Sequence, residues 1–397
     1  MKKIVIDARL SGLEHAGIGR YTRMLVEHLK DLRFTCPQML RIKRCRRAIY
    51  DLRIISPNIR HYTLAEQIQM PEILKRENPD LVHFPHFNVP LLYNSPFIVT
   101  IHDLLWHEQV GTTATTLPAW IYWLKYLAYR LVLRHAVLKS KAIIVPSNWV
   151  KKKIVERFPE AEKKVHVIYE GIADKFKEEG RRNKEEGILE QYELKNRQYL
   201  IYTGSLYPHK NVNLVLDILP RFPDLKFIVA CARNVFWEKF KKEVINRGLE
   251  DRVILAGFIP DDELAILYKN ALAFVFPSKS EGFGLPGLEA MAAGLPVISS
   301  NAGSLPEVYG GAAAYFDPMN EDDLIKKIGE IREDKEYRGK IIKLGRERAV
   351  RFTWEKCAEE TLRVYEKVLR APAVRSPLPW STSTRRGVET AGFGRTG

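Results

Sequence analysis

Two glutamates in this sequence are well placed for chemistry on a ligand rich in hydroxyl groups. Glu281 and Glu289 enclose the segment Gly-Phe-Gly-Leu-Pro-Gly-Leu. Carboxylates accept hydrogen bonds from sugar hydroxyls, and a carboxylate one turn into a helix suits the vicinal diol of a ribose. We therefore expect Glu281 to contact a sugar and Glu289 to contact a ribose.

The segment between the two glutamates predicts a strand, a glycine-rich loop and a helix start. The apolar run 271–277 precedes it, Pro286 suits a first helical turn, and Gly294 suits a C-terminal cap. Unpaired N–H groups and the positive end of the helix dipole form a binding site for a phosphate. We expect three glycines, Gly282, Gly284 and Gly287, to let the backbone approach a ligand closely.

The rest of the chain alternates strand and helix patterns, which predicts an α/β fold with parallel sheets. In the second half, strands are expected at 199–204, 226–230, 253–256, 271–276, 296–299 and 313–316. In the first half they are expected at 3–8, 80–84, 96–103 and 141–146. The strand that ends at His102 and Asp103 places polar side chains at the carboxyl edge of a sheet, where such folds bind ligands. Ser147 is expected to cap the next helix.

The glutamate-flanked segment, preceded by Phe-Pro-Ser278 and followed by Gly-Leu-Pro-Val297 and Leu-Pro-Glu-Val308, resembles the retaining glycosyltransferases of family four. The resemblance extends from Lys3 to about Leu369. It implies the GT-B fold, in which two Rossmann-like domains with parallel sheets face each other across a cleft. The implied divisions are an acceptor-side domain (1–172), a connection (173–198), a donor-binding domain (199–352), a helix that crosses back (353–370) and a disordered tail (371–397). Within the connection we expect a short helix near 189–194.

The resemblance also implies roles for individual residues. Glu281 and His102 would contact the donor sugar, Glu289 the ribose, and Lys210 the donor diphosphate; the catalytic set is His102, Lys210 and Glu281. The first loop, which contains Gly17-Ile-Gly19-Arg-Tyr-Thr, would face the donor phosphates. The implied donor-binding residues are Gly17, Gly19, Ser205, Gly282, Phe283, Gly284, Leu285 and Glu289.

One position departs from the family pattern. Many members carry Arg where this chain has Ser205, so half of the usual cationic clamp on the diphosphate is missing or is supplied elsewhere. His209 and Arg233 are the candidates to replace it.

The implied activity is retaining transfer of a hexose, of mannose or glucose type, from a nucleotide-diphospho-sugar to a saccharide or glycolipid acceptor. Neither a metal nor a cofactor is expected, because Lys210 and the helix dipole would neutralise the diphosphate. The alternatives are a sugar-nucleotide epimerase or hydrolase of the same shape, and a basic nucleic-acid-binding protein. A dehydrogenase is disfavoured because Thr22 stands where a dinucleotide fingerprint needs its third glycine.

The formal charge of +15 is concentrated in the first half, where residues 1–170 hold 27 Lys and Arg against 15 Asp and Glu. Such a surface suits anionic lipid, a lipid-phosphate acceptor or nucleic acid. The predicted helix at 117–138 combines Trp and Tyr with basic residues, which suits either a core or a membrane interface. We expect a cytoplasmic protein, with peripheral attachment to the inner face of the membrane as an option and no nucleic-acid partner.

The stretch from Arg33 to Arg60 has no clear period and carries eight basic residues against one acid. The family pattern requires its second strand and a helix in this stretch. Three interpretations stay open: a solvated basic excursion, a patch for anionic membrane, or a segment altered by a reading-frame error.

Overall fold

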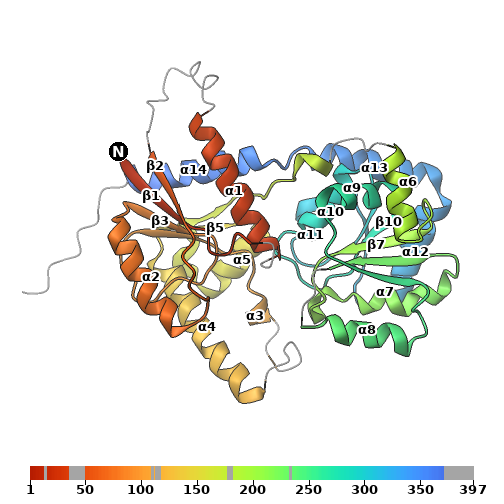
Figure 1. Cartoon of the computed structure of the whole chain (residues 1–397), viewed down its shortest axis with the longest axis horizontal. Helices are drawn as coiled ribbons and strands as arrows, with labels where there is room; N and C mark the ends of the chain where they lie inside the picture. The colour runs from red at the N-terminus through yellow and green to blue at the C-terminus, as the bar shows by residue number, and fades with distance from the viewer. Residues whose placement is uncertain are drawn as a thin grey trace, which may run out of the picture.

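The computed structural model describes residues 1–12, 16–34, 50–108, 111, 118–176, 182–231 and 235–370 of the chain. Two lobes lie side by side, each built on one parallel sheet with helices around it (Figure 1). In the described ranges, no helix combines the length and the apolar character needed to cross a bilayer.

The first lobe contains a six-stranded parallel sheet in the order β2-β1-β3-β4-β5-β6. Its inner strands are short apolar runs buried on both faces, as expected for a parallel sheet covered by helices. The strands are β1 (Lys2–Asp7), β2 (Tyr50–Ile55), β3 (Leu81–Phe84), β4 (Phe97–Thr100), β5 (Ala142–Val145) and β6 (Val165–Val167). The helices are α1 (Ala16–Phe34), α2 (Leu64–Glu77), α3 (Leu105–Glu108), α4 (Ala119–Lys139) and α5 (Asn148–Arg157).

The second strand required by the family pattern lies inside the stretch that had no clear period. Strand β2 pairs in parallel with β1, with Ile4 opposite Leu52 and Ile6 opposite Ile54. As an edge strand it is only partly buried, which explains its weak pattern. Residues 35–49, which hold most of the basic excess, lie outside the described residues.

The second lobe repeats the architecture, with the strand order β12-β11-β10-β7-β8-β9. Each of its predicted strands is confirmed within two residues, as β7 (Tyr199–Thr203), β8 (Lys226–Ala230), β9 (Val253–Gly257), β10 (Ala273–Phe276), β11 (Val297–Ser300) and β12 (Ala314–Phe316). The helices are α6 (Arg182–Gln191), α7 (Asn213–Ile218), α8 (Trp237–Asn246), α9 (Asp261–Asn270), α10 (Leu285–Ala292), α11 (Leu305–Tyr309), α12 (Glu321–Glu333), α13 (Lys335–Ala349) and α14 (Trp354–Arg370).

The expectation for the connection between the lobes was wrong in one detail. We expected a short helix near 189–194, but α6 begins at Arg182 and contains Gly187. Tertiary contacts with α9 explain the difference, since Ile188 is buried and Lys269 on α9 binds Glu185 at 2.6 Å. Such contacts override the helix-breaking tendency of a single glycine.

The last helix crosses from the second lobe back to the first, as the resemblance implies (Figure 1). Tyr365 on α14 is 2.7 Å from Nδ1 of buried His83 on β3. Where the two crossing segments meet, a side chain at Gly171 would lie 2.2 Å from the backbone nitrogen of Trp354. Only glycine therefore allows the two connections to pass at this distance.

Candidate active site

The glycine-rich loop connects β10 to α10, as predicted. Gly284 is the N-cap of α10 with φ of 95°, Pro286 lies in the first turn, and Gly294 follows the helix with φ of 79°. The hydroxyl of buried Tyr309 donates to the carbonyl of Gly284 at 2.5 Å and fixes the turn. The first N–H groups of α10 are thus held at the carboxyl edge of the second sheet.

We expected the loop glycines to leave space for a ligand. This reason was wrong for Gly282 and Gly287, because a β-carbon at either position would point toward protein. A β-carbon at Gly282 would lie 2.0 Å from the carbonyl oxygen of His102 in the first lobe. At Gly287 it would lie 2.2 Å from the hydroxyl of Tyr309. These glycines let the loop pack against the segment after β4 and against α11. A ligand at this loop would therefore contact backbone atoms on its opposite side.

Glu281 and Lys210 form a pair inside the second lobe. The ammonium of Lys210 lies 2.7 Å and 2.8 Å from the two carboxylate oxygens of Glu281. Lys210 ends a short 3₁₀ turn after β7, and this turn is joined to the loop because Lys279 N–H donates to the carbonyl of His209 at 2.7 Å. Glu281 is 8% exposed, so the pair is largely shielded from water.

Glu289 is paired across the lobes with a residue that sequence reasoning missed. Arg20, which follows Gly19 on α1, places Nη1 3.0 Å from Glu289 and Nη2 3.2 Å from Asp261 on α9. Burial outweighs the attraction of Arg20 and raises the pKa of Glu289 to about 7. Glu289 Oε1 is the oxygen next to Arg20, but it makes no hydrogen bond of good geometry. Contact between Glu289 and a ribose stays a prediction.

The two glycines of the first loop differ in their surroundings. A β-carbon at Gly17 would meet nothing within 4 Å, whereas one at Gly19 would lie 2.1 Å from the carbonyl oxygen of Gly12. Gly19 is therefore required for packing against its own loop. Gly17 leaves the first turn of α1 open.

His102 lies at the carboxyl edge of β4 and is fully engaged within the first lobe. Its Nδ1 is 3.2 Å from Oε1 of Glu170, and its Nε2 is 3.0 Å from the carbonyl oxygen of Pro85. Burial alone lowers the pKa of His102, but the hydrogen bond and charge of Glu170 outweigh it and raise the pKa overall. Contact between His102 and a donor sugar stays a prediction, and no sequence pattern pointed to Glu170.

The candidates to replace the missing arginine do not supply a cation among the described residues. Burial and the charge of Lys210 lower the pKa of His209 to about 3, so its ring is neutral near pH 7. Arg233 lies outside the described residues. The backbone carbonyl of Ser205 accepts a hydrogen bond from the hydroxyl of Tyr202 at 2.6 Å, within the turn that follows β7.

Two residues of the predicted donor-binding loop have buried side chains. The Phe283 ring packs 6.1 Å from Tyr169 and 5.8 Å from Phe352, and Leu285 belongs to the core of the second lobe. Only the backbone of these residues is available to a donor.

The two lobes meet directly beside Glu281. A small space, open to solvent, lies between Asp103, Trp149 and Lys153 of the first lobe and Ser280 and Glu281 of the second. Burial raises the pKa of Asp103.

Hydrogen bonds close this junction. Ser147 caps α5, as predicted, and also donates to the carbonyl of Gly282 at 2.7 Å, so its role extends beyond its own helix. Glu307 on α11 accepts from the backbone N–H groups of Asn148 and Trp149 at 2.7 Å and 3.0 Å. A carboxylate of one lobe thus binds the N-terminus of a helix of the other.

Comparison with known proteins agrees with this geometry. The family described as Glycosyltransferase Family 4 matches residues 15–176, and the family described as Glycosyl transferases group 1 matches residues 184–348. O-antigen chain mannosyltransferase B of Escherichia coli is 35% identical over 184 residues, which cover 45% of this chain and 48% of that protein. The alignment thus spans about half the length of that relative.

Two further comparisons cover more of the chain. O-antigen chain mannosyltransferase RfbU of Salmonella typhimurium is 27% identical over 273 residues, 68% of this chain and 70% of that protein. The crystal structure of HepE of Anabaena in complex with UDP and glucose has a TM-score of 0.69 and 17% identity, and covers 92% of this chain and 100% of that one. The chain therefore belongs to the group 1 glycosyltransferases of family four and has the GT-B fold.

Proposed function

We propose that this protein transfers a hexosyl group, of mannose or glucose type, from a nucleotide-diphospho-sugar to a saccharide with retention of configuration. The observation that carries the proposal is the pair of charged contacts on either side of the α10 N-terminus. Lys210 lies with Glu281 at one end, and Arg20 lies with Glu289 at the other. The names of two similar proteins support mannose, and the UDP and glucose bound to a similar structure support a nucleotide-sugar donor.

In the proposed reaction, the bond between the anomeric carbon and the diphosphate oxygen breaks while a bond to the acceptor oxygen forms on the same face. The acceptor proton passes to the departing phosphate. Negative charge grows on the diphosphate, beside Lys210 and the first N–H groups of α10. Fixed donors of this kind, in a site shielded from water, usually supply the largest share of catalysis.

We further propose that no metal ion takes part, since a lysine and a helix N-terminus can neutralise the diphosphate. Transfer should then continue unchanged in excess EDTA. Loss of activity in EDTA that returns with magnesium or manganese would contradict this part of the proposal.

The first test is a thermal-shift panel of UDP, GDP, ADP and their glucose and mannose conjugates. We expect one nucleotide to stabilise the protein, and its sugar conjugate to yield an α-linked product from an α-linked donor, as read by NMR. An epimerase or hydrolase would instead alter the donor without added acceptor. A protein that no member of the panel stabilises would contradict the proposed function.

We also propose that the acceptor is presented at an anionic membrane surface, on which α4 rests. The outward face of α4 carries large apolar side chains that are more than half exposed: Trp120, Trp123, Leu124, Leu127 and Leu131. Their spacing places them on one face of the helix, and the helix has four exposed basic residues, Lys125, Arg130, Arg134 and Lys139, and no acid. An apolar face bordered by basic residues suits the headgroup region of anionic lipid.

Liposome flotation tests this attachment. The protein should float with phosphatidylcholine vesicles that contain phosphatidylglycerol, and a Trp123→Ser/Leu127→Ser variant should stay at the bottom. Phe258→Ser is the matched control, because Phe258 is 58% exposed on the second lobe. Equal flotation of all three proteins, or none of the wild type, would refute the attachment without affecting the transferase proposal.

A further inference from the structure

The ring of His102 is held at both of its nitrogens by groups that accept hydrogen bonds. Nδ1 lies 3.2 Å from Oε1 of Glu170, and Nε2 lies 3.0 Å from the carbonyl oxygen of Pro85. A carboxylate and a carbonyl oxygen only accept, so each nitrogen must carry a proton to pair with its neighbour. A neutral ring has a single N–H and would place a nitrogen lone pair against an oxygen on one side. The contacts of His102 therefore fit an imidazolium.

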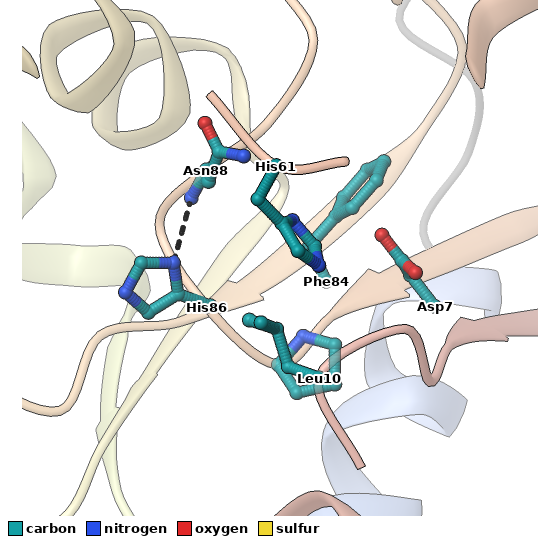
Figure 2. A pocket seen from close by; sticks show the side chains of 7 residues that line it. Asp7, Leu10, His61, Phe84, His86 and Asn88 are labelled. Carbon is teal, nitrogen blue, oxygen red and sulfur yellow. Dashed lines mark hydrogen bonds between the residues drawn. The ribbon is translucent and has the colours of Figure 1, made fainter. Parts of the chain in front are cut away.

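The carbonyl of Pro85 belongs to a segment after β3 that is itself fixed by hydrogen bonds. In this segment the backbone N–H of Asn88 donates to Nδ1 of His86 at 3.4 Å (Figure 2). The side chain of Asn88 donates to Glu66 at 2.7 Å. These contacts form part of a buried charged network composed of Asp7, Arg9, Glu66 and Asn88. The acceptor opposite Nε2 of His102 is thus held in place by the first lobe.

The acceptor opposite Nδ1 is a shielded carboxylate. The side chains of His102 and Glu170 are 12% and 10% exposed, so water screens the pair little. Burial alone lowers the pKa of His102, but the hydrogen bond and charge of Glu170 raise it overall. His83 on the neighbouring strand β3 is also buried, and its nitrogens face the hydroxyls of Tyr365 and Thr100. Burial and the charge of His102 lower the pKa of His83 to about 3, which shows what a histidine in this sheet does without a carboxylate partner.

Other titratable groups face the pair from the elements packed around it. The ring of Tyr21 on α1 lies 4.6 Å from that of His102, and Cys357 on α14 lies near Glu170. Burial raises the pKa of both residues, so both are neutral near pH 7. The charged groups near the pair are Asp103 beside His102, and Arg20 and Glu289 near Glu170. Among the described residues, Glu170 is the acid that hydrogen-bonds the ring.

The pair lies beside the proposed donor site. A β-carbon at Gly282 would lie 2.0 Å from the carbonyl oxygen of His102, so the end of β4 touches the loop before α10. The next residue, Asp103, borders the space beside Glu281. Glu170 reaches the ring from the segment after β6, two strands away from β4 in the sheet. The positive partner of the pair thus belongs to the strand that contacts the α10 loop.

We propose that Glu170 is a positioning residue for the transfer, because it holds His102 as an imidazolium at the lobe junction with no nitrogen free to take a proton. The proposal rests on the proposed transferase function and deepens it. His102 then acts as a fixed positive charge beside the α10 loop, where negative charge grows on the departing diphosphate. The acceptor proton passes to the phosphate, and no proton moves through the ring.

Nitrogen-15 NMR of the full chain with labelled histidine reads the proton state, and His102→Asn assigns the signal. We expect the two ring nitrogens of His102 to show the closely matched shifts of an imidazolium at pH 6 and at pH 8. Glu170→Gln should give a neutral ring at pH 8, because burial then outweighs the remaining contacts. The Gln amide can donate to the neutral Nδ1, so the variant removes the charge and keeps the hydrogen bond. A neutral ring in the wild type, or an imidazolium in Glu170→Gln at pH 8, overturns the proposal.

Glu355→Gln is the matched control for this measurement. Glu355 also pairs with a histidine, since its Oε1 lies 3.3 Å from Nε2 of His28, but its side chain is 57% exposed. The control should leave the shifts of His102 and the turnover unchanged. A control that changes His102 as much as Glu170→Gln does would overturn the specific role of Glu170.

Kinetics test the positioning role. At pH 8, Glu170→Gln should lower kcat about tenfold, less than the roughly 10²- to 10³-fold loss for removal of a direct donor. The ratio of its kcat to that of the wild type should rise as the pH falls to 6, because the ring regains its proton. Saturating donor keeps the effect of Glu170 on the pKa of Glu289 out of this ratio. A ratio that is independent of pH, or full turnover at pH 8, overturns the positioning role.

The two readouts separate this proposal from the transferase function. Imidazolium shifts that depend on Glu170, in a protein that no nucleotide stabilises, would mean that the transferase function has failed while the pair stands. A neutral His102 in a protein that transfers a hexosyl group would mean that only the assignment of Glu170 has failed.

Discussion

The two lobes share one architecture but prepare their binding surfaces in different ways. In the second lobe, two contacts that shape the proposed donor site lie at one sheet edge: Lys210 binds Glu281, and Tyr309 fixes the turn at Gly284. In the first lobe, a buried charged network joins three separate segments and holds Tyr62, which is strained and exposed. The proposed donor site thus depends largely on contacts at one sheet edge, whereas the network of Asp7, Arg9, Glu66 and Asn88 in the first lobe depends on charged and polar side chains from separate segments.

The two lobes also differ in the apolar side chains that they expose. Among the described residues, the first lobe exposes large apolar side chains on α2, on the loop after β3 and on α4: Leu64, Ile68, Leu91, Leu92, Trp120, Trp123, Leu124, Leu127 and Leu131. The exposed apolar residues of the second lobe are scattered over several elements, such as Ile245, Phe258 and Met319. Scattered residues need no explanation, whereas several on one face of a helix, as on α4, are typical of an interaction surface. The comparison predicts that the two lobes respond differently to substitution.

The largest expected effect is on folding of the first lobe. Glu66→Ala removes a fully buried carboxylate and leaves the charge of Arg9 only partly matched, which should lower the free energy of unfolding by about 3–5 kcal/mol. Glu156→Ala on the same lobe removes an exposed pair and should cost less than about 1 kcal/mol. Urea denaturation followed by fluorescence measures both. Equal stability of the two variants would show that the network is dispensable.

The next effect is on catalysis in the second lobe. Lys210→Met removes the charge beside the departing diphosphate and should lower kcat about 10²- to 10³-fold in protein that is still folded at the assay temperature. It also leaves the shielded carboxylate of Glu281 without its partner, so the melting temperature should fall as well. Lys279→Met is the matched control, because Lys279 lies on the loop that carries Glu281 and its side chain is exposed. Steady-state kinetics with the donor found in the nucleotide panel measures the effect. Comparable turnover by both variants would remove Lys210 from the mechanism.

A smaller effect concerns pH and the contact between the lobes. The pKa of Glu289 is raised from 4.5 to about 7, so this residue stabilises the fold most below pH 4.5 and loses that contribution as the pH rises through 7. A ribose diol is held best by the charged carboxylate. Donor affinity should therefore increase up to about tenfold between pH 6 and pH 8, since one pKa unit corresponds to about a tenfold change. Calorimetric titration across this range should show a flat profile for Glu289→Gln; the same slope in both proteins would assign it to another group.

The smallest expected effect concerns the hydrogen bond between the lobes. Ser147→Ala removes a helix cap and the donor to Gly282, and should cost about 1 kcal/mol. Asn320→Ala removes a cap of α12, within one lobe, and should cost about as much. Only Ser147→Ala should also weaken donor binding, because it frees the loop beside Glu281. Thermal melts with and without nucleotide compare the two, and identical nucleotide shifts would confine Ser147 to capping.

The sequence by itself determined the features that depend on local pattern. Alternating apolar runs and helix signals predicted the two parallel sheets, and the loop between Glu281 and Glu289 predicted the turn into α10. These features follow from periodicity and from the backbone preferences of glycine and proline, which act over a few residues. The same local rules misjudged α6, whose stability comes from contacts with α9.

Only the tertiary structure decided which charges meet. Arg20 and Glu289 are far apart in the sequence, and so are Arg9, Glu66 and Asn88, yet each set is joined in the folded chain. Nothing in a short stretch of sequence specifies such partners, because an ion pair depends on distance and burial and not on order along the chain. The same reason explains why His209 is neutral, why Ser147 reaches the opposite lobe, and why the glycines of the α10 loop face protein.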